Sequence, residues 1–319
     1  MSDKNQCCEK FKTAIGGQAL IEGIMMRGPE KDAVVIRGKD GITVETTPRK
    51  IRKKRSFATW PLIRGCVNFF DSQVVGVKAL MRSADLSPEF AEEEPSKLDK
   101  WLEKKLGNEK FQSFLIGCAV AMGLGLSILL FFLLPMVASS LLDGVITNTL
   151  LLNLIEGLVR MVIFVIYILL CSRMAEMKRV FSYHGAEHKT IFCYEAGLPL
   201  TVENVRKQPC HHPRCGTSFL FVVIFVSIMV STVVFAIWPV HNALLRFVAH
   251  LIMLPAIVGI SFEFNRYVGR HDGPITRILT APGLWMQNFT TFEPDDSMIE
   301  VGIEALKLVL PEEEGADAW

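Results

Sequence analysis

The chain has 319 residues, of which half are hydrophobic and 21% are charged, and its mean hydropathy is +0.33. This apolar share exceeds that of ordinary soluble domains and argues against a purely soluble globular enzyme. The net charge of +1 gives no overall case for a nucleic-acid partner. The eight cysteines show no spacing typical of a disulfide framework, so we expect reduced thiols, some of them metal ligands.

Residues 1–113 form a polar N-terminal region, because 21 of the 34 Lys and Arg precede residue 114. The opening lacks the apolar core of a secretory signal, which predicts a cytoplasmic N-terminus. AVVIR, the turn signal GKDG and ITVET alternate as in a β-hairpin, and the glycine-rich GGQALIEGIMMRGP before them indicates tight turns. Apolar residues at helical spacing over 68–81 predict an amphipathic helix, which a charged linker follows.

A basic run, RKIRKKR, occupies residues 49–55 and is followed by Phe57 and Trp60. Positive charge of this kind is typical of chain segments next to a membrane, where anionic lipid headgroups are its partner. A second interpretation is contact with RNA or a ribosome through the phosphates. The run has no residue pattern that would recognise particular bases.

Four segments are apolar enough to cross a bilayer, for which a helix needs about 20 residues. Pro135 and Pro255 lie inside two of them and predict kinks rather than breaks, because neighbouring helices can satisfy the freed backbone groups. We therefore expect an α-helical integral membrane protein with a small N-terminal α+β cytoplasmic region. The expected spans are residues 115–141, 146–171, 217–240 and 243–262.

The charges next to these spans predict their orientation. Seven Lys and Arg lie in the connection between the second and third spans, whereas the two short loops have none. By the positive-inside rule, both termini and this connection face the cytoplasm of a bacterial cell. The chain then divides into an N-terminal region (1–113), two transmembrane hairpins (114–172 and 217–262), a cytoplasmic connection (173–216) and a C-terminal segment with an amphipathic helix (263–319).

The strongest motif is HGAEH at residues 184–188. It matches H-x-x-E-H, in which two histidines one helical turn apart bind a metal and the glutamate acts as a general base. His184 and His188 are therefore candidate ligands, and Glu187 is the candidate catalytic residue. The other interpretation is that the two histidines hydrogen-bond within a helical bundle that holds no metal.

A second cluster, CHHPRCG, occupies residues 210–216 directly before the third span. Thiolate and imidazole groups at this density favour zinc, with iron as the second choice. We expect His212, Arg214 and Cys215 to fold back on the HGAEH helix, with His212 and Cys215 as ligands. The other interpretation is a loop that caps the third helix and places its arginine at the lipid headgroups.

Two acidic residues are further candidates for this site. Glu195 lies two turns after His188 on the same helical face. Glu263 is near the end of the fourth span, where a carboxylate has to be solvated or paired. It either pairs with Arg266 or faces the site.

The expected spans also carry charged side chains. Glu156 and Arg160 are four residues apart in the second span, and Arg246 and His250 are four apart in the fourth. Pairing along a helix face is a sufficient explanation for both pairs. The alternative is a conduction or transport pathway through the bundle.

Four motifs together resemble one known family. They are GGQALIEGIMMRGP, YHGAEHKTI, HPRCGTSFL and PGLWMQNFTTFEPDDSMIEVGIEALK, and they extend over nearly the whole chain. The sequence resembles the YqhQ-like family of bacterial membrane proteins, whose domain has no known function and whose members are often described as predicted metal-dependent enzymes. The resemblance adds Glu22 and Arg27 of the first motif to the candidate site residues.

The sequence is compatible with three functions. The first is a metal-dependent hydrolase at the cytoplasmic membrane face, acting on membrane-proximal peptides or lipid-linked substrates. The second is a non-enzymatic scaffold with a structural metal or none, which docks a translocon, a ribosome or a membrane enzyme. The third is a small transporter, which with four spans would require an oligomer.

Overall fold

The computed structural model describes residues 11–39, 41–49, 57–87, 108–142, 145–240, 242–271, 273–313 and 315–318. The basic run after Arg49 and most of the charged linker lie outside these residues. The chain divides into two compact units. The first unit comprises residues 1–88, 168–223 and 255–319, and the second comprises residues 89–167 and 224–254.

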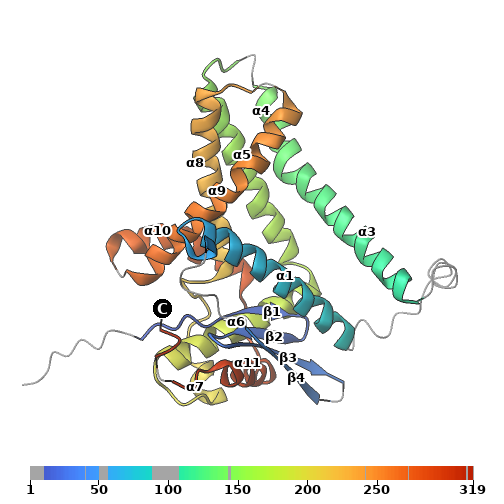
Figure 1. Ribbon diagram of the computed structural model, residues 1–319, viewed down its shortest axis with the longest axis vertical. Helices are drawn as coiled ribbons and strands as arrows, with labels where there is room; N and C mark the ends of the chain where they lie inside the picture. Colours follow the sequence, from blue (N-terminus) through green and yellow to red (C-terminus); the bar gives the residue numbers. More distant parts are fainter. Residues whose placement is uncertain are drawn as a thin grey trace, which may run out of the picture. The chain divides into compact units, whose positions relative to one another are not determined.

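The first unit contains a four-stranded antiparallel sheet in the order β1-β2-β3-β4 (Figure 1). The predicted hairpin is confirmed as β3 and β4, in which Val35 lies opposite Val44. The glycine-rich segment before it forms a second hairpin, β1 and β2, and not only turns. Glu22 in its turn has a φ of 51°, which is uncommon for a residue other than glycine. The strands are β1 (Gly16–Leu20), β2 (Gly23–Arg27), β3 (Lys31–Gly38) and β4 (Gly41–Pro48).

Helices cover both faces of this sheet (Figure 1). Alternate residues of a strand point to opposite faces, so Ile24 and Val35 pack with α6 and α11, while Met25 packs with Ala79 of α1. Burial of each large apolar side chain contributes about 1.5–3 kcal/mol, which holds the three layers together. The helices are α1 (Ile63–Leu86), α6 (Ala175–Glu195) and α11 (Asp296–Val309).

Two of these helices were expected from the sequence. The amphipathic segment 68–81 lies within α1. The C-terminal amphipathic helix is α11, and Asp295 caps it by accepting a hydrogen bond from the Met298 amide at 3.0 Å. The first unit also contains the short helix α7 (Val202–Arg206) and α10 (Pro274–Thr290).

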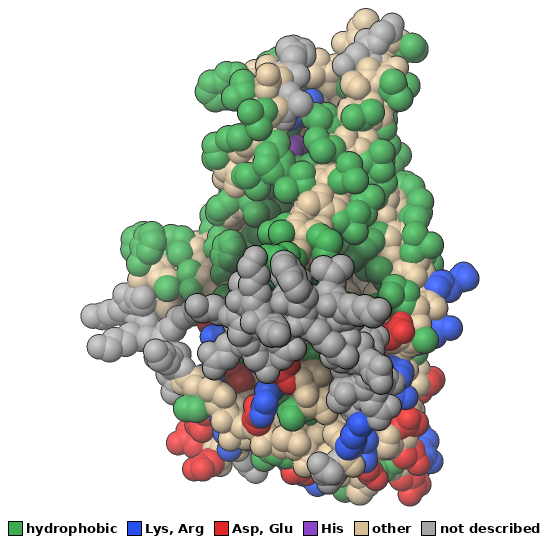
Figure 2. Space-filling view, turned by 90° about the vertical axis from the view of Figure 1, so that its right-hand side faces the viewer, with side chains coloured by type: hydrophobic (Ala, Val, Ile, Leu, Met, Phe, Trp, Pro, Cys, Tyr) green, Lys and Arg blue, Asp and Glu red, His purple; other side chains and the backbone are tan. Residues whose placement is uncertain are grey.

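Four stretches of helix among the described residues are long and apolar enough to cross a membrane: Gly117–Ser140, Thr149–Cys171, Gly216–Ile237 and Leu244–Arg270. Only 6–28% of the residues in these stretches are buried by the protein, and Figure 2 shows mainly hydrophobic side chains on the spanning helices. Such surfaces suit contact with lipid chains. The helices are α3 (Asn108–Ile128), α4 (Leu134–Ser140), α5 (Thr149–Cys171), α8 (Gly216–Ile237) and α9 (Ala243–Arg270).

Neither proline breaks its span. A π-helical turn, Leu129–Leu133, joins α3 to α4, and Pro135 lies in the first turn of α4. The helix α9 continues through Pro255. The expectation that both spans stay continuous is confirmed.

Candidate metal centre

The HGAEH motif lies in the middle of α6, which packs on β1, β2 and α11. His184 and His188 are one turn apart, so both side chains lie on the same face of the helix. Gly185 lets another segment approach this helix closely. A Cβ atom at Gly185 would lie 2.0 Å from the Phe292 carbonyl oxygen, so any side chain there would push away the segment that follows α10.

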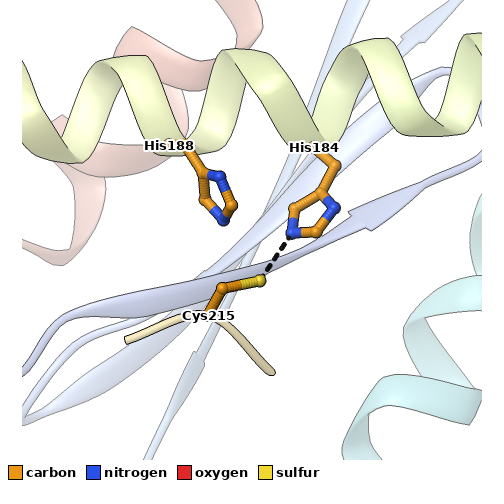
Figure 3. Close-up of side chains that lie close together, drawn as sticks. All are labelled: His184, His188 and Cys215. Atoms are coloured by element: carbon orange, nitrogen blue, oxygen red, sulfur yellow. Dashed lines mark hydrogen bonds between the residues drawn. The ribbon is translucent and has the colours of Figure 1, made fainter. Parts of the chain in front are cut away.

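Three side chains of the first unit come together at this face (Figure 3). One ligand atom each from His184, His188 and Cys215 lies within 4.8 Å of the other two. Nε2 of His184 is 3.1 Å from Sγ of Cys215. The structure thus brings the HGAEH helix and the HPRCG loop together, as the sequence led us to expect.

Backbone carbonyls determine how the two imidazoles are oriented. Nδ1 of His184 lies 2.8 Å from the Thr290 oxygen, and Nδ1 of His188 lies 2.5 Å from the Cys210 oxygen. A carbonyl only accepts, so each Nδ1 donates a proton and each Nε2 is directed to the cluster. Among the described residues, Nε2 of His188 has no hydrogen-bond partner. Histidines that ligate a metal are held in the same way.

The charges of the cluster follow from its burial and its neighbours. Burial disfavours the Cys215 thiolate, but His184 and His188 outweigh this effect and hold the pKa of Cys215 well below its usual range. Burial also disfavours the His184 imidazolium, yet the nearby Cys215 sulfur raises the pKa of His184 to about 9. Without a metal, the pair is therefore a thiolate and an imidazolium, and a metal cation would replace the imidazolium proton.

Glu187 lies beside this cluster and is 95% buried. Its Oε1 accepts a hydrogen bond from the Gly17 amide at 2.9 Å, while its Oε2 has no hydrogen-bond partner among the described residues. Burial raises the pKa of Glu187, and the charges of His184 and His188 oppose that rise. A Cβ atom at Gly17 would lie 2.9 Å from Cδ of Glu187, which explains why a glycine stands at this position of β1.

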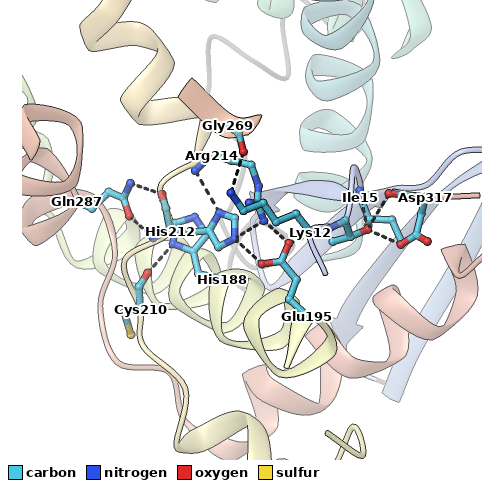
Figure 4. A network of polar contacts seen from close by, with 11 residues as sticks. Lys12, Ile15, His188, Glu195, Cys210, His212, Arg214, Gly269, Gln287 and Asp317 are labelled. Carbon is cyan, nitrogen blue, oxygen red and sulfur yellow. Dashed lines mark hydrogen bonds and ion pairs between the residues drawn. The ribbon is translucent and has the colours of Figure 1, made fainter. Parts of the chain in front are cut away.

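His212 belongs to a different network, next to the cluster (Figure 4). Its Nε2 lies 3.7 Å from Oε2 of Glu195, and Arg214 forms an ion pair with the same carboxylate. The His212 ring packs on Phe192, with 4.5 Å between centroids. His212 and Glu195, both candidate ligands, therefore support the loop that carries Cys215 from outside the three-residue cluster.

Gln287 of α10 clamps the same loop. Its Oε1 accepts from the His212 amide at 2.7 Å, and its Nε2 donates to the His212 carbonyl at 2.8 Å and to Oγ of Ser218 at 2.9 Å. Gln287 is fully buried, so these bonds are shielded from water. They hold the backbone of His212 before Cys215 and the side chain of Ser218 after it. Sequence reasoning missed Gln287, although it lies within the closing motif PGLWMQNFTTFEP.

The structure places the three remaining candidates away from the cluster. Glu263 forms a two-bond ion pair with Arg64 of α1, and one of the two bonds is 2.6 Å long. This partner differs from both alternatives, which were a pair with Arg266 and a place in the site. Glu22 accepts two bonds from Arg179 of α6, at 2.5 and 2.6 Å, and one from the Tyr183 hydroxyl at 3.2 Å.

Arg27 extends from β2 to α1. It donates to Asp71 and to Ser72, each at 2.9 Å, and it pairs with Asp32 at 3.3 Å. Like Glu22 in the β1–β2 turn, it joins the sheet to one of its covering helices. Both residues thus hold the layers that position α6.

Comparison with known proteins supports the resemblance seen in the motifs. The chain is 35% identical over 306 residues to "Uncharacterized protein YqhQ" of Bacillus subtilis (strain 168). The aligned residues cover 94% of this chain and 93% of that protein. No solved structure matches the chain. A family model described as "Protein of unknown function (DUF1385)" matches residues 60–312. The chain therefore belongs to this family of proteins of unknown function.

Proposed function

We propose that the chain binds one divalent metal ion through His184, His188 and Cys215. The orientation of the two imidazoles carries this proposal: both Nδ1 atoms are bound to carbonyls, and both Nε2 atoms are directed to a thiolate. Two nitrogens and one sulfur form a ligand set typical of zinc, with iron as the second choice.

We further propose that the centre is hydrolytic. Three protein ligands leave one position of a tetrahedral metal open, as in catalytic zinc sites. A metal ion at such a centre supplies Lewis acidity that makes water a nucleophile near neutral pH. Glu187 would accept the proton of that water at its free Oε2, while the Gly17 amide holds its Oε1 in place.

The substrate of such a hydrolase would be close to a membrane. The helix α6 begins four residues after the candidate span α5 ends, and Cys215 directly precedes the candidate span α8. Membrane-proximal peptides and lipid-linked molecules are therefore the substrate classes we propose. The charge distribution around the spans supports the cytoplasmic face of a bacterial cell membrane as the location.

Metal content measured by elemental mass spectrometry tests the site. The full chain is purified in detergent without chelator, together with a variant that combines His184→Ala and His188→Ala. His271→Ala is the matched control, because Nδ1 of this exposed histidine also contacts a carbonyl, at 2.8 Å. We expect one zinc or iron per chain in the wild type and in the control, and none in the double variant. A wild-type protein without metal contradicts the proposal.

Substitution of Glu187 tests the hydrolytic step. The Glu187→Gln variant should keep its metal and lose the metal-dependent hydrolysis of 4-nitrophenyl acetate, by roughly 100-fold or more if the carboxylate is the general base. Equal hydrolysis by wild type and variant would remove Glu187 from the chemistry while leaving the metal site in place.

The burial of the centre favours a second candidate, a structural metal in a scaffold protein. His188 is 1% exposed, and Glu187 and Cys215 are each 5% exposed. Glu187 would then be the fourth ligand and would close the coordination sphere. X-ray absorption distinguishes the two candidates, because a closed site has four protein ligands and no water. A closed site also predicts that Glu187→Gln loses metal affinity.

A further inference from the structure

A second buried polar cluster lies within the second unit, between α5 and α9. Its centre is Glu156, which pairs with Arg160 at 3.0 Å and with Arg246 at 2.6 Å. Nε2 of His250 lies 4.0 Å from the same carboxylate. The view in Figure 2 shows a histidine and a basic side chain among the hydrophobic side chains of the spanning helices. Two guanidinium groups against one carboxylate leave an excess of one positive charge.

The helix with Pro135 holds one of these arginines. Proline has no N–H, so Pro135 cannot donate to the carbonyl of Phe131 four residues before it. Nε of Arg160 donates to that carbonyl instead, at 2.8 Å. Arg160 thus donates both to the neighbouring helix and to Glu156, and these two bonds hold it in position.

Several donors of this cluster have no acceptor. Nδ2 of Asn153, Nε of Arg246 and Nε2 of His250 are buried and have no hydrogen-bond partner among the residues that the structure describes. The same holds for one oxygen, Oε2 of Glu156, which forms an ion pair with Arg246. His250 is 93% buried, and its ring packs edge-on against Phe132 and Phe235. Buried polar groups in native proteins nearly always have a partner. The three unpartnered nitrogens outnumber the one unpartnered oxygen, so the cluster has fewer acceptors than donors.

A small cavity of about 20 Å³ lies at this cluster. A space of this size holds one water molecule or one monatomic ion, and excludes sulfate and phosphate. A water molecule would accept from one or two donors and leave the excess charge uncompensated. A halide accepts several hydrogen bonds and neutralises that charge. The lining residues are Phe132, Leu133, Met136, Glu156, Arg160, Arg246, Phe247 and His250.

We propose that this cavity binds a single monovalent halide, with chloride as the physiological ion, through Arg246 and His250. The site lies near the start of both helices, because Asn153 is the fifth residue of α5 and Arg246 the fourth of α9. The ion would enter from the end of the spans where the two short loops connect them. This proposal does not depend on the metal centre.

Thermal unfolding of the detergent-purified full chain tests this site. Sodium chloride and sodium bromide are compared with sodium gluconate at equal ionic strength, since gluconate is too large for the cavity. We expect chloride and bromide to raise the midpoint in a saturable way. The shift should require at least tenfold more chloride in Arg246→Gln and in His250→Phe, and stay unchanged in Arg270→Gln, which alters an exposed arginine at the far end of α9.

Line broadening of the ³⁵Cl resonance gives a second measurement that does not require the variants to be stable. Wild-type protein should broaden the chloride signal, and bromide should reverse the broadening in competition. An equal chloride response in wild type, Arg246→Gln and His250→Phe would overturn the proposal, as would a wild-type protein that neither broadens the signal nor responds to chloride. The metal content of the same samples distinguishes an effect on this cavity from an effect on the metal centre, because neither variant should change the metal content.

Discussion

The two buried clusters differ in their charges and in the balance of polar atoms that they leave without a partner. At the centre on α6, Nε2 of His188 and Oε2 of Glu187 lie beside the thiolate of Cys215, so atoms with free lone pairs gather there. Between α5 and α9, most of the atoms without a partner are nitrogens, of Arg246, Asn153 and His250, next to an excess of positive charge, and Oε2 of Glu156 is the exception. The first arrangement suits a cation and the second an anion. The difference shows that the sign of a bound ion can be inferred from which atoms remain unpaired.

The largest expected effect concerns the two cysteines near α6. Cys215→Ser should weaken zinc binding by roughly 1,000-fold or more, because it removes a thiolate ligand. Cys210→Ser should change it by less than about tenfold, because burial raises the pKa of Cys210 to about 12 and only its backbone carbonyl contacts His188. Titration against a chelating dye measures both. Equal losses in the two variants would remove Cys215 from the ligand set.

The next largest effect concerns the carboxylate of the anion cluster. Glu156→Gln leaves two buried guanidinium groups without a counter-charge, which should destabilise the fold by about 3 kcal/mol in gluconate. Chloride should recover part of this loss, because the cluster then carries two excess positive charges. Chemical unfolding in the two salts measures the difference. A loss of stability that is the same in both salts would contradict an anion in this cavity.

A pair of neighbouring glycines tests the contact between the sheet and Glu187. A Cβ atom at Gly17 would lie 2.7 Å from the Met25 carbonyl oxygen, whereas one at Gly16 would have nothing within 4 Å. Gly17→Ala should therefore destabilise the protein by about 2 kcal/mol and displace Glu187, while Gly16→Ala should be close to neutral. Thermal unfolding compares the two. Equal midpoints would mean that β1 does not pack on α6 in this way.

The smallest effect is expected at the clamp on the Cys215 loop. Gln287→Leu preserves most of the side-chain volume and removes the bonds to both backbone groups of His212. Partners behind the ligands typically change metal affinity by about 10–100-fold, and the lower end applies here because the ligands themselves stay intact. The exposed Asn288→Leu is the neighbouring control. Affinity that is unchanged in Gln287→Leu would make the clamp unnecessary for the metal.

The local parts of the structure could be predicted from the sequence. Alternating residues gave the β3–β4 hairpin, apolar runs gave the four candidate spans, and motif spacing placed His184 and His188 on one face of a helix. These features depend on neighbours along the chain. The approach of Cys215 to His184 was expected only because both motifs lie in one short connection.

The choice of distant ion-pair partners could not be predicted. Glu263 pairs with Arg64, which is 199 residues away, although Arg266 is one turn along the same helix. Glu195 lies outside the three-residue cluster, where its carboxylate faces His212 and pairs with Arg214. Such choices depend on which helices pack together, and sequence spacing within one helix carries no information on that packing.

The network around Glu195 also sets an order of assembly. Glu195 accepts a hydrogen bond from the Thr13 amide, and the Thr13 hydroxyl donates to Asp317, 304 residues further along the chain. A ribosome releases Thr13, Glu195 and Asp317 in that order, so the contacts behind the Cys215 loop are completed only after Asp317 has been synthesised. The contacts that support the proposed metal site are therefore completed late in biosynthesis, after all four candidate spans have been synthesised.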